Sequence, residues 1–112
     1  MEYEISVQDF SRLREGAPAE SAAQFCLLDV RQPWETEIAA LPGGYLIPMD
    51  ELPDRVAGEL RPDAHIVVYC HHGRRSLAVV MWLREQGFAR AQSLTGGIEE
   101  WSQTIDPSVP RY

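Results

Sequence analysis

The stretch VVYCHHGRRS, from Val67 to Ser76, decides the fold that we expect for this chain. An apolar run that is typical of a buried strand ends in Cys70. Two histidines, a glycine and two arginines follow, and a new apolar pattern with helical spacing begins at Leu77. A buried strand that passes through a short polar loop into a helix is a βα unit, and a series of such units builds a mainly parallel sheet.

The same alternation of strands and helices extends to both sides of this stretch. Strands are predicted at residues 3–5, 25–30, 45–47, 65–70 and 91–94. Helices are predicted after an N-cap at Ser6, after Pro33, from an N-cap at Asp50 with Pro53 in the first turn, from near Ser76 to Gly87, and over 96–105. A loop is predicted at 15–23 and an extended tail at 105–112. We therefore predict a single α/β domain over residues 1–112.

The charges of the chain limit the classes of ligand that it can bind. The 112 residues carry a formal net charge of −7, which argues against nucleic acid and anionic membranes as partners. All ten basic residues are arginines, which excludes lysine Schiff-base chemistry and a P-loop lysine. Arg74 and Arg75 therefore stand out against an acidic background. A basic spot in an acidic protein indicates a small anionic ligand.

The first residues and the two cysteines indicate the compartment. The N-terminal stretch MEYEISVQDF is acidic and mixed, unlike a signal peptide, and no apolar stretch is long enough to span a membrane. We therefore expect a cytoplasmic protein in which Cys26 and Cys70 do not form a disulfide. Cys26 lies inside an apolar strand, and we predict that it is an inert core thiol.

Cys70 stands at the carboxyl end of a strand, where open parallel sheets bind their ligands. Backbone N–H groups of the following loop, the positive end of the next helix and two arginine charges all favour the thiolate over the thiol. A glycine lets this loop bend where a side chain would obstruct it. We predict that Cys70 is the catalytic residue and that the next six residues form a cradle for an oxyanion or a sulfur anion. These are His71, His72, Gly73, Arg74, Arg75 and Ser76.

The two histidines and the loop length leave alternatives open. A metal site of His71 and His72 with Cys70 lacks a supporting CxxC or HxxxH pattern, so no metal is expected. One histidine could act as a general base, but we favour a role for both in shaping the loop, with one of them meeting substrate. Cysteine-dependent phosphatases carry a C-x5-R signature. Here Arg75 is the fifth residue after Cys70, so the loop is one residue short and suits a single sulfur atom.

Four motifs, in this order, resemble those of the rhodanese-homology domain family, the single-domain thiosulfate sulfurtransferases. LLDVRQPWE (27–35) resembles the first motif of the family and LPGGYLIP (41–48) the turn that follows it. YCHHGRRS (69–76) resembles its active-site loop, and GGIEEW (96–101) its C-terminal G-G-x-x-x-W motif. The dipeptide Ala39-Ala40 stands where many members have Gly-His, and we expect little effect of this departure on the chemistry.

The resemblance implies a five-stranded, mainly parallel sheet with helices on both faces. It also implies that Cys70 takes sulfur from a small anionic donor such as thiosulfate, becomes a persulfide, and passes the sulfur to cyanide, a thiol or a sulfur-relay protein without a cofactor. Arg75 closes the six-residue loop, here called the Cys70 loop (residues 70–75). Asp29 and Arg31 are expected to support the fold, and the three tryptophans are expected to be core anchors: Trp34, Trp82 and Trp101.

Two other functions fit the same motifs. One is a cysteine-dependent phosphatase or arsenate reductase of related architecture, against which the loop length argues. The other is a non-catalytic interaction module on the same fold, which commonly lacks the cysteine that this chain keeps. The sequence is compatible with a monomer or a homodimer.

Overall fold

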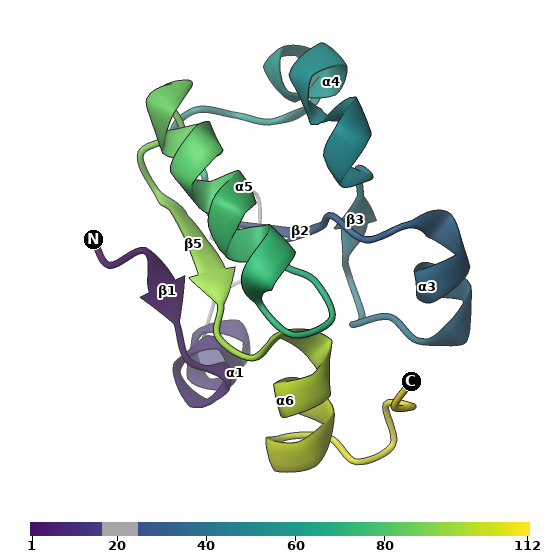
Figure 1. The fold of residues 1–112 in the computed structure, drawn as a ribbon. Coiled ribbons are helices and arrows are strands. Elements are labelled where there is room, and N and C mark those ends of the chain that lie inside the picture. Colours follow the sequence, from purple (N-terminus) through teal and green to yellow (C-terminus); the bar gives the residue numbers. More distant parts are fainter. Residues whose placement is uncertain (17–24) are drawn as a thin grey trace.

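The computed structural model describes residues 1–16 and 25–112 of the chain (Figure 1). Its centre is a five-stranded sheet in the order β1-β5-β4-β2-β3, in which each pair of neighbouring strands is parallel. The strands are β1 (Glu4–Ile5), β2 (Phe25–Asp29), β3 (Tyr45–Leu46), β4 (His65–Tyr69) and β5 (Ala91–Leu94). The predicted α/β fold with a five-stranded, mainly parallel sheet is confirmed.

Helices cover both faces of the sheet, as predicted (Figure 1). One hydrophobic core lies between the sheet and helices α4 and α5, and a second lies between the sheet and helices α1 and α6. The helices are α1 (Val7–Gly16), α3 (Pro33–Ile38), α4 (Leu52–Glu59), α5 (Arg74–Glu85) and α6 (Gly97–Thr104), and a 3-10 turn, η1 (Met49–Glu51), precedes α4.

Strand β4 occupies the middle of the sheet and is buried on both sides. Because side chains alternate along a strand, Ile66 and Val68 belong to the core under α4 and α5. Val67 and Tyr69 belong to the core under α1 and α6. This double burial explains the continuous apolar run in the sequence. It also places Cys70, the residue after the strand, at the carboxyl edge of the sheet centre.

Some details differ from the sequence predictions. Helix α5 begins at Arg74 and not near Ser76, because Gly73 takes a left-handed φ of +98° and caps the helix. Asp50 lies within η1 and does not cap α4, because the chain makes a 3-10 turn before the helix starts. Most of the predicted loop at 15–23 lies outside the described residues, and α1 continues through Gly16.

The predictions for the tryptophans and for the C-terminal segment also need correction. Trp101 is buried, but Trp34 in α3 is exposed, and it contacts the ring of Tyr112 and not the core. The segment 105–112 is not extended: a turn closed by hydrogen bonds from Ser108 to the Asp106 carboxylate folds it back. Val109 is consequently buried, and the chain end lies near α3 (Figure 1). None of the described helices has the length and apolar character needed to cross a membrane.

Candidate active site

The Cys70 loop joins the carboxyl end of β4 to the first turn of α5. The backbone N–H groups of Gly73 and Ser76 donate hydrogen bonds to Cys70 Sγ over 3.1 Å and 3.4 Å. The Ser76 hydroxyl lies 3.5 Å from the same sulfur. Because both N–H groups belong to the start of α5, the sulfur also faces the positive end of the helix dipole. The two N–H groups and the helix dipole are thus placed to stabilise a negative charge that develops on the sulfur.

A buried pair of serines lies beside the sulfur. Ser76 Oγ donates to the carbonyl oxygen of Gly73 over 3.2 Å and lies 2.7 Å from Oγ of Ser93, which is a residue of β5. Both serines are buried, and the hydrogen bond joins the first turn of α5 to the neighbouring strand. The sequence does not single out Ser93, because a serine in a short strand belongs to no motif.

The start of α6 holds the first part of the Cys70 loop. The N–H of Ile98 donates to the carbonyl oxygen of Cys70 over 3.0 Å, and the N–H of Glu99 donates to that of His71 over 3.1 Å. Gly97 allows this close approach, since a Cβ on it would lie 2.4 Å from the Cys70 carbonyl oxygen. Its φ of +63° is also one that favours glycine. The GGIEEW motif is therefore part of the support of the loop.

The two arginines of the loop have different environments. Arg75 forms two hydrogen bonds, each of 3.0 Å, with the carboxylate of Glu35, a buried residue of α3. These bonds raise the pKa of the Arg75 guanidinium and balance its charge. The charge of Arg75 therefore still acts on Cys70, as predicted, but it is shared with the Glu35 carboxylate. Arg74 is exposed, and no ion pair joins it to an acidic side chain in the described part of the chain.

The predicted supporting residues form a buried ion pair at the end of β2. Arg31 donates to the Asp29 carboxylate over 2.9 Å from Nε and over 2.8 Å from Nη2. It also donates to the carbonyl oxygen of Ala39 over 2.8 Å, and this main-chain contact does not depend on the side chain there. Among the described residues, neither member of the pair bonds directly to the Cys70 loop. Their position fits the predicted role in supporting the fold.

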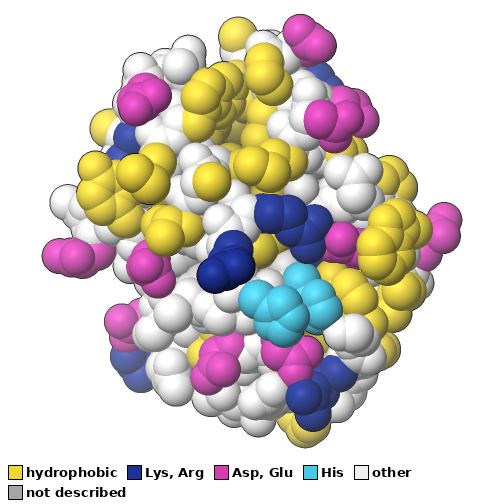
Figure 2. Space-filling model, in the orientation of Figure 1, with side chains coloured by type: hydrophobic (Ala, Val, Ile, Leu, Met, Phe, Trp, Pro, Cys, Tyr) yellow, Lys and Arg dark blue, Asp and Glu magenta, His cyan; other side chains and the backbone are white. Residues whose placement is uncertain are grey.

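A stack of three rings lies against the loop. The ring of His71 packs at 3.9 Å on the ring of Tyr112, with an angle of 6° between the planes, and at 3.9 Å on the ring of His72. His72 is exposed. Figure 2 shows that histidine and arginine side chains gather in the middle of this face, with acidic side chains around them. The sequence does not single out Tyr112, because apolar residues show no helical or strand spacing in its segment.

A family model described as "Rhodanese-like domain" matches residues 6–104. The chain belongs to this family. It is 42% identical over 90 residues to the Rhodanese-like/PpiC domain-containing protein 12, chloroplastic, of Arabidopsis thaliana, a match that covers 77% of this chain and 30% of that protein. It is 35% identical over 83 residues to a protein named Sulfurtransferase from Allochromatium vinosum, which covers 74% of this chain and 77% of that protein.

Among solved structures, the rhodanese-related protein from Thermoplasma volcanium matches with a TM-score of 0.80 and 27% identity. The match covers 99% of this chain and 100% of that one. The chain thus spans less than a third of the length of the Arabidopsis relative but the whole of this solved domain. The resemblance to the rhodanese family that the motifs indicated is confirmed.

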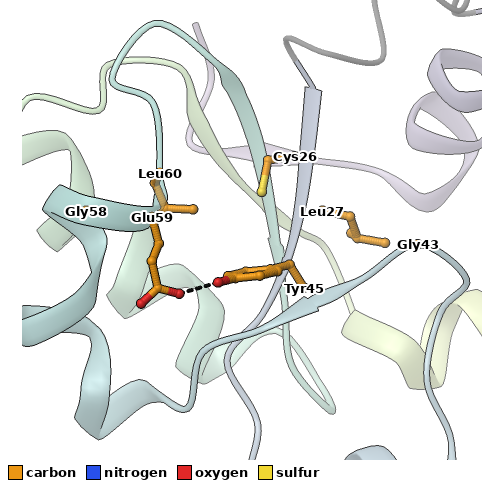
Figure 3. A pocket seen from close by; sticks show the side chains of 7 residues that line it. All are labelled: Cys26, Leu27, Gly43, Tyr45, Gly58, Glu59 and Leu60. Carbon is orange, nitrogen blue, oxygen red and sulfur yellow. Dashed lines mark hydrogen bonds between the residues drawn. The ribbon is translucent and has the colours of Figure 1, made fainter.

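The second cysteine of this rhodanese-like domain lies apart from the Cys70 loop. Cys26 is partly buried and lines a cavity of about 520 Å³ that does not include Cys70 (Figure 3). Its burial raises the pKa of the thiol, so the unreactive protonated form predominates at neutral pH. The other residues around the cavity are Leu27, Gly43, Tyr45, Gly58, Glu59 and Leu60. No cluster of three or more metal-ligating side chains occurs within residues 1–16 and 25–112.

The environment of His71 predicts a pH dependence of stability. Burial, followed by the nearby charge of His72, holds the pKa of His71 below its ordinary value of 6.5, although Glu99 acts in the opposite direction. The pKa of this histidine is therefore higher in the unfolded chain than in the folded one. As the pH falls through the range between these two pKa values, the unfolded chain binds a proton before the folded chain does, so the free energy of unfolding decreases. We expect urea denaturation to show a larger loss from about pH 7 to about pH 5 in the wild type than in His71→Asn. Equal losses in the two proteins would contradict this.

Proposed function

We propose that this rhodanese-like domain is a sulfurtransferase in which Cys70 carries the transferred sulfur. The observation that carries the proposal is the convergence of two backbone N–H groups on Cys70 Sγ at the positive end of α5. Such donors stabilise a thiolate before the reaction and an anionic persulfide after it. Membership of the rhodanese-like family and the relative named Sulfurtransferase support the same chemistry.

The reaction that we propose has two steps. The Cys70 thiolate attacks the outer sulfur of thiosulfate, a sulfur–sulfur bond forms on the enzyme, and the sulfur–sulfur bond of the donor breaks. Sulfite leaves with the electron pair of that bond. A nucleophilic acceptor, cyanide in an assay or a thiol in the cell, then attacks the terminal sulfur, and Cys70 returns to the thiolate. No step needs a metal or an organic cofactor.

The shape and charge of the site support a small anionic donor. Cys70 is only 1% exposed, so a donor that presents a single projecting sulfur atom suits it better than a bulky group. The exposed cation of Arg74 lies in the same loop and attracts an anion in an otherwise acidic protein. The donor class that we propose is therefore thiosulfate or a persulfide, and the acceptor class is a small thiol or the thiol of a sulfur-relay protein.

Steady-state kinetics test this function. With thiosulfate and cyanide as substrates, we expect thiocyanate to form and the double-reciprocal plots to be parallel, because sulfite leaves before the acceptor reacts. The same preparation is then given an aryl phosphate. Hydrolysis of the phosphate that is faster than thiocyanate formation would contradict the proposal and favour a phosphatase. Inactivity toward thiosulfate, protein persulfides and the phosphate would favour an interaction module.

A further inference from the structure

Tyr112 lies eight residues beyond the segment that matches the family model, yet its side chain packs into the site. Its ring stacks face to face on His71, the residue that follows Cys70. Its hydroxyl group lies between two ion pairs. Arg31 Nη1 donates to the Tyr112 hydroxyl over 3.0 Å, and the hydroxyl donates to Glu35 Oε2 over 3.1 Å.

The Tyr112 hydroxyl therefore completes a continuous hydrogen-bonded chain. The chain runs from the buried Asp29–Arg31 pair through the hydroxyl to Glu35, and from Glu35 through two hydrogen bonds to Arg75. Glu35 is buried, so each donor that it loses leaves a desolvated carboxylate less well satisfied. Burial raises the pKa of the Tyr112 phenol, which keeps it protonated and able to donate at neutral pH.

These contacts reach both ends of the Cys70 loop. The ring of Tyr112 covers His71 at the start of the loop, and the hydroxyl acts through Glu35 on Arg75 at its end. The neighbouring residue adds a further contact, because Arg111 binds Glu99, whose N–H group holds the carbonyl oxygen of His71. The Gly73 N–H group lies between these two anchored residues, and the Ser76 N–H group follows directly after Arg75.

We propose that Tyr112 is a positioning residue for sulfur transfer, which holds the two ends of the Cys70 loop at the separation that aims the Gly73 and Ser76 N–H groups at Cys70 Sγ. This inference rests on the proposed function and assigns to it a residue outside the four motifs. Tyr112 does not touch the sulfur, and it acts through His71 and through the Glu35–Arg75 pair.

The test compares two tyrosines that each donate to a glutamate. Tyr112→Phe removes the hydroxyl and keeps the ring, and Tyr112→Ala removes both. Tyr45→Phe is the matched control, because Tyr45 is exposed and its hydroxyl bonds to Glu59, away from the Cys70 loop. In each protein we would measure the single-turnover rate of sulfur loading from thiosulfate, its dependence on thiosulfate concentration, and the hydrogen exchange of the Gly73 and Ser76 amides.

We expect the loading rate at saturating thiosulfate to fall about threefold in Tyr112→Phe and about tenfold in Tyr112→Ala, since lost hydrogen bonds and a displaced loop both slow the attack. The concentration that gives half-maximal loading changes less than about twofold, because Arg74 still attracts the donor. Exchange of the two amides speeds up in the same order. Tyr45→Phe matches the wild type in all three measurements.

The outcomes separate the inference from the proposed function. A wild type that takes up no sulfur would contradict the proposed function, and the amide exchange would still decide whether Tyr112 positions the loop. Normal loading and normal exchange in Tyr112→Phe and Tyr112→Ala would overturn the inference and leave the proposed function intact. If Tyr112→Ala does not fold, Tyr112→Phe decides alone, because it retains the stacked ring.

Discussion

Replacing Cys70 with serine is expected to lower the rate of thiocyanate formation by about a thousandfold or more. The serine hydroxyl is protonated at neutral pH, and an oxygen atom cannot form the sulfur–sulfur bond of a persulfide. The substitution is nearly isosteric, and the Gly73 and Ser76 N–H groups can donate to oxygen as they do to sulfur. The fold should therefore be retained, and circular dichroism with urea denaturation would verify this.

Cys26→Ser is the matched control for this experiment. Cys26 lies on another part of the sheet, lines a separate cavity and has a raised thiol pKa, so we expect activity within about twofold of the wild type. Substantial activity in Cys70→Ser, or a loss of activity in Cys26→Ser alone, would contradict the assignment of the sulfur carrier.

A second large effect is expected from Gly97→Ala, which adds one methyl group below the Cys70 loop. The new Cβ would lie 2.4 Å from the carbonyl oxygen of Cys70 and 2.5 Å from that of His71. The strain at a φ of +63° adds to this clash. We expect the free energy of unfolding to decrease by about 3 kcal/mol. The rate of sulfur transfer per folded molecule should fall at least about tenfold, because the displaced carbonyl groups move the loop.

Gly58→Ala provides the control for a methyl group added to a glycine. Gly58 lies in α4, and a Cβ there would meet no atom within 4 Å. Because alanine favours a helix more than glycine does, we expect this variant to be more stable by about 0.5–1 kcal/mol and fully active. Wild-type stability and activity in Gly97→Ala would show that the start of α6 does not hold the loop.

The sheet and the position of Cys70 could be predicted from the sequence for a physical reason. A parallel sheet covered by helices is dry on both faces, so the central strand must be apolar over residues 66–70, and this run is readable without a structure. The polar loop that follows it then has to lie at the carboxyl edge. Gly73 marks the bend of the loop. Helix α5 begins directly after it, at Arg74, which is two residues before the start near Ser76 that the sequence predicted.

The partners of the loop could not be predicted in the same way. Glu35 stands in a recognised motif, but its pairing with Arg75 joins residues 40 positions apart and depends on the tertiary fold. The contact of Tyr112 with Glu35 spans 77 positions and begins in a segment without periodic pattern. The spacing of apolar residues shows which segments are buried. It does not show whether a charged side chain is paired, because a paired arginine and an unpaired one look alike in a sequence.

The most direct test of the account is the intact mass of the purified protein before and after thiosulfate, followed by a cyanide chase. We predict that the wild type gains the mass of one sulfur atom, that peptide mapping places it on Cys70, and that cyanide removes it. Cys70→Ser should show no gain under the same conditions. A folded wild-type protein with Cys70 in its free thiol form that gains no sulfur from thiosulfate or from a protein persulfide would contradict the central claim.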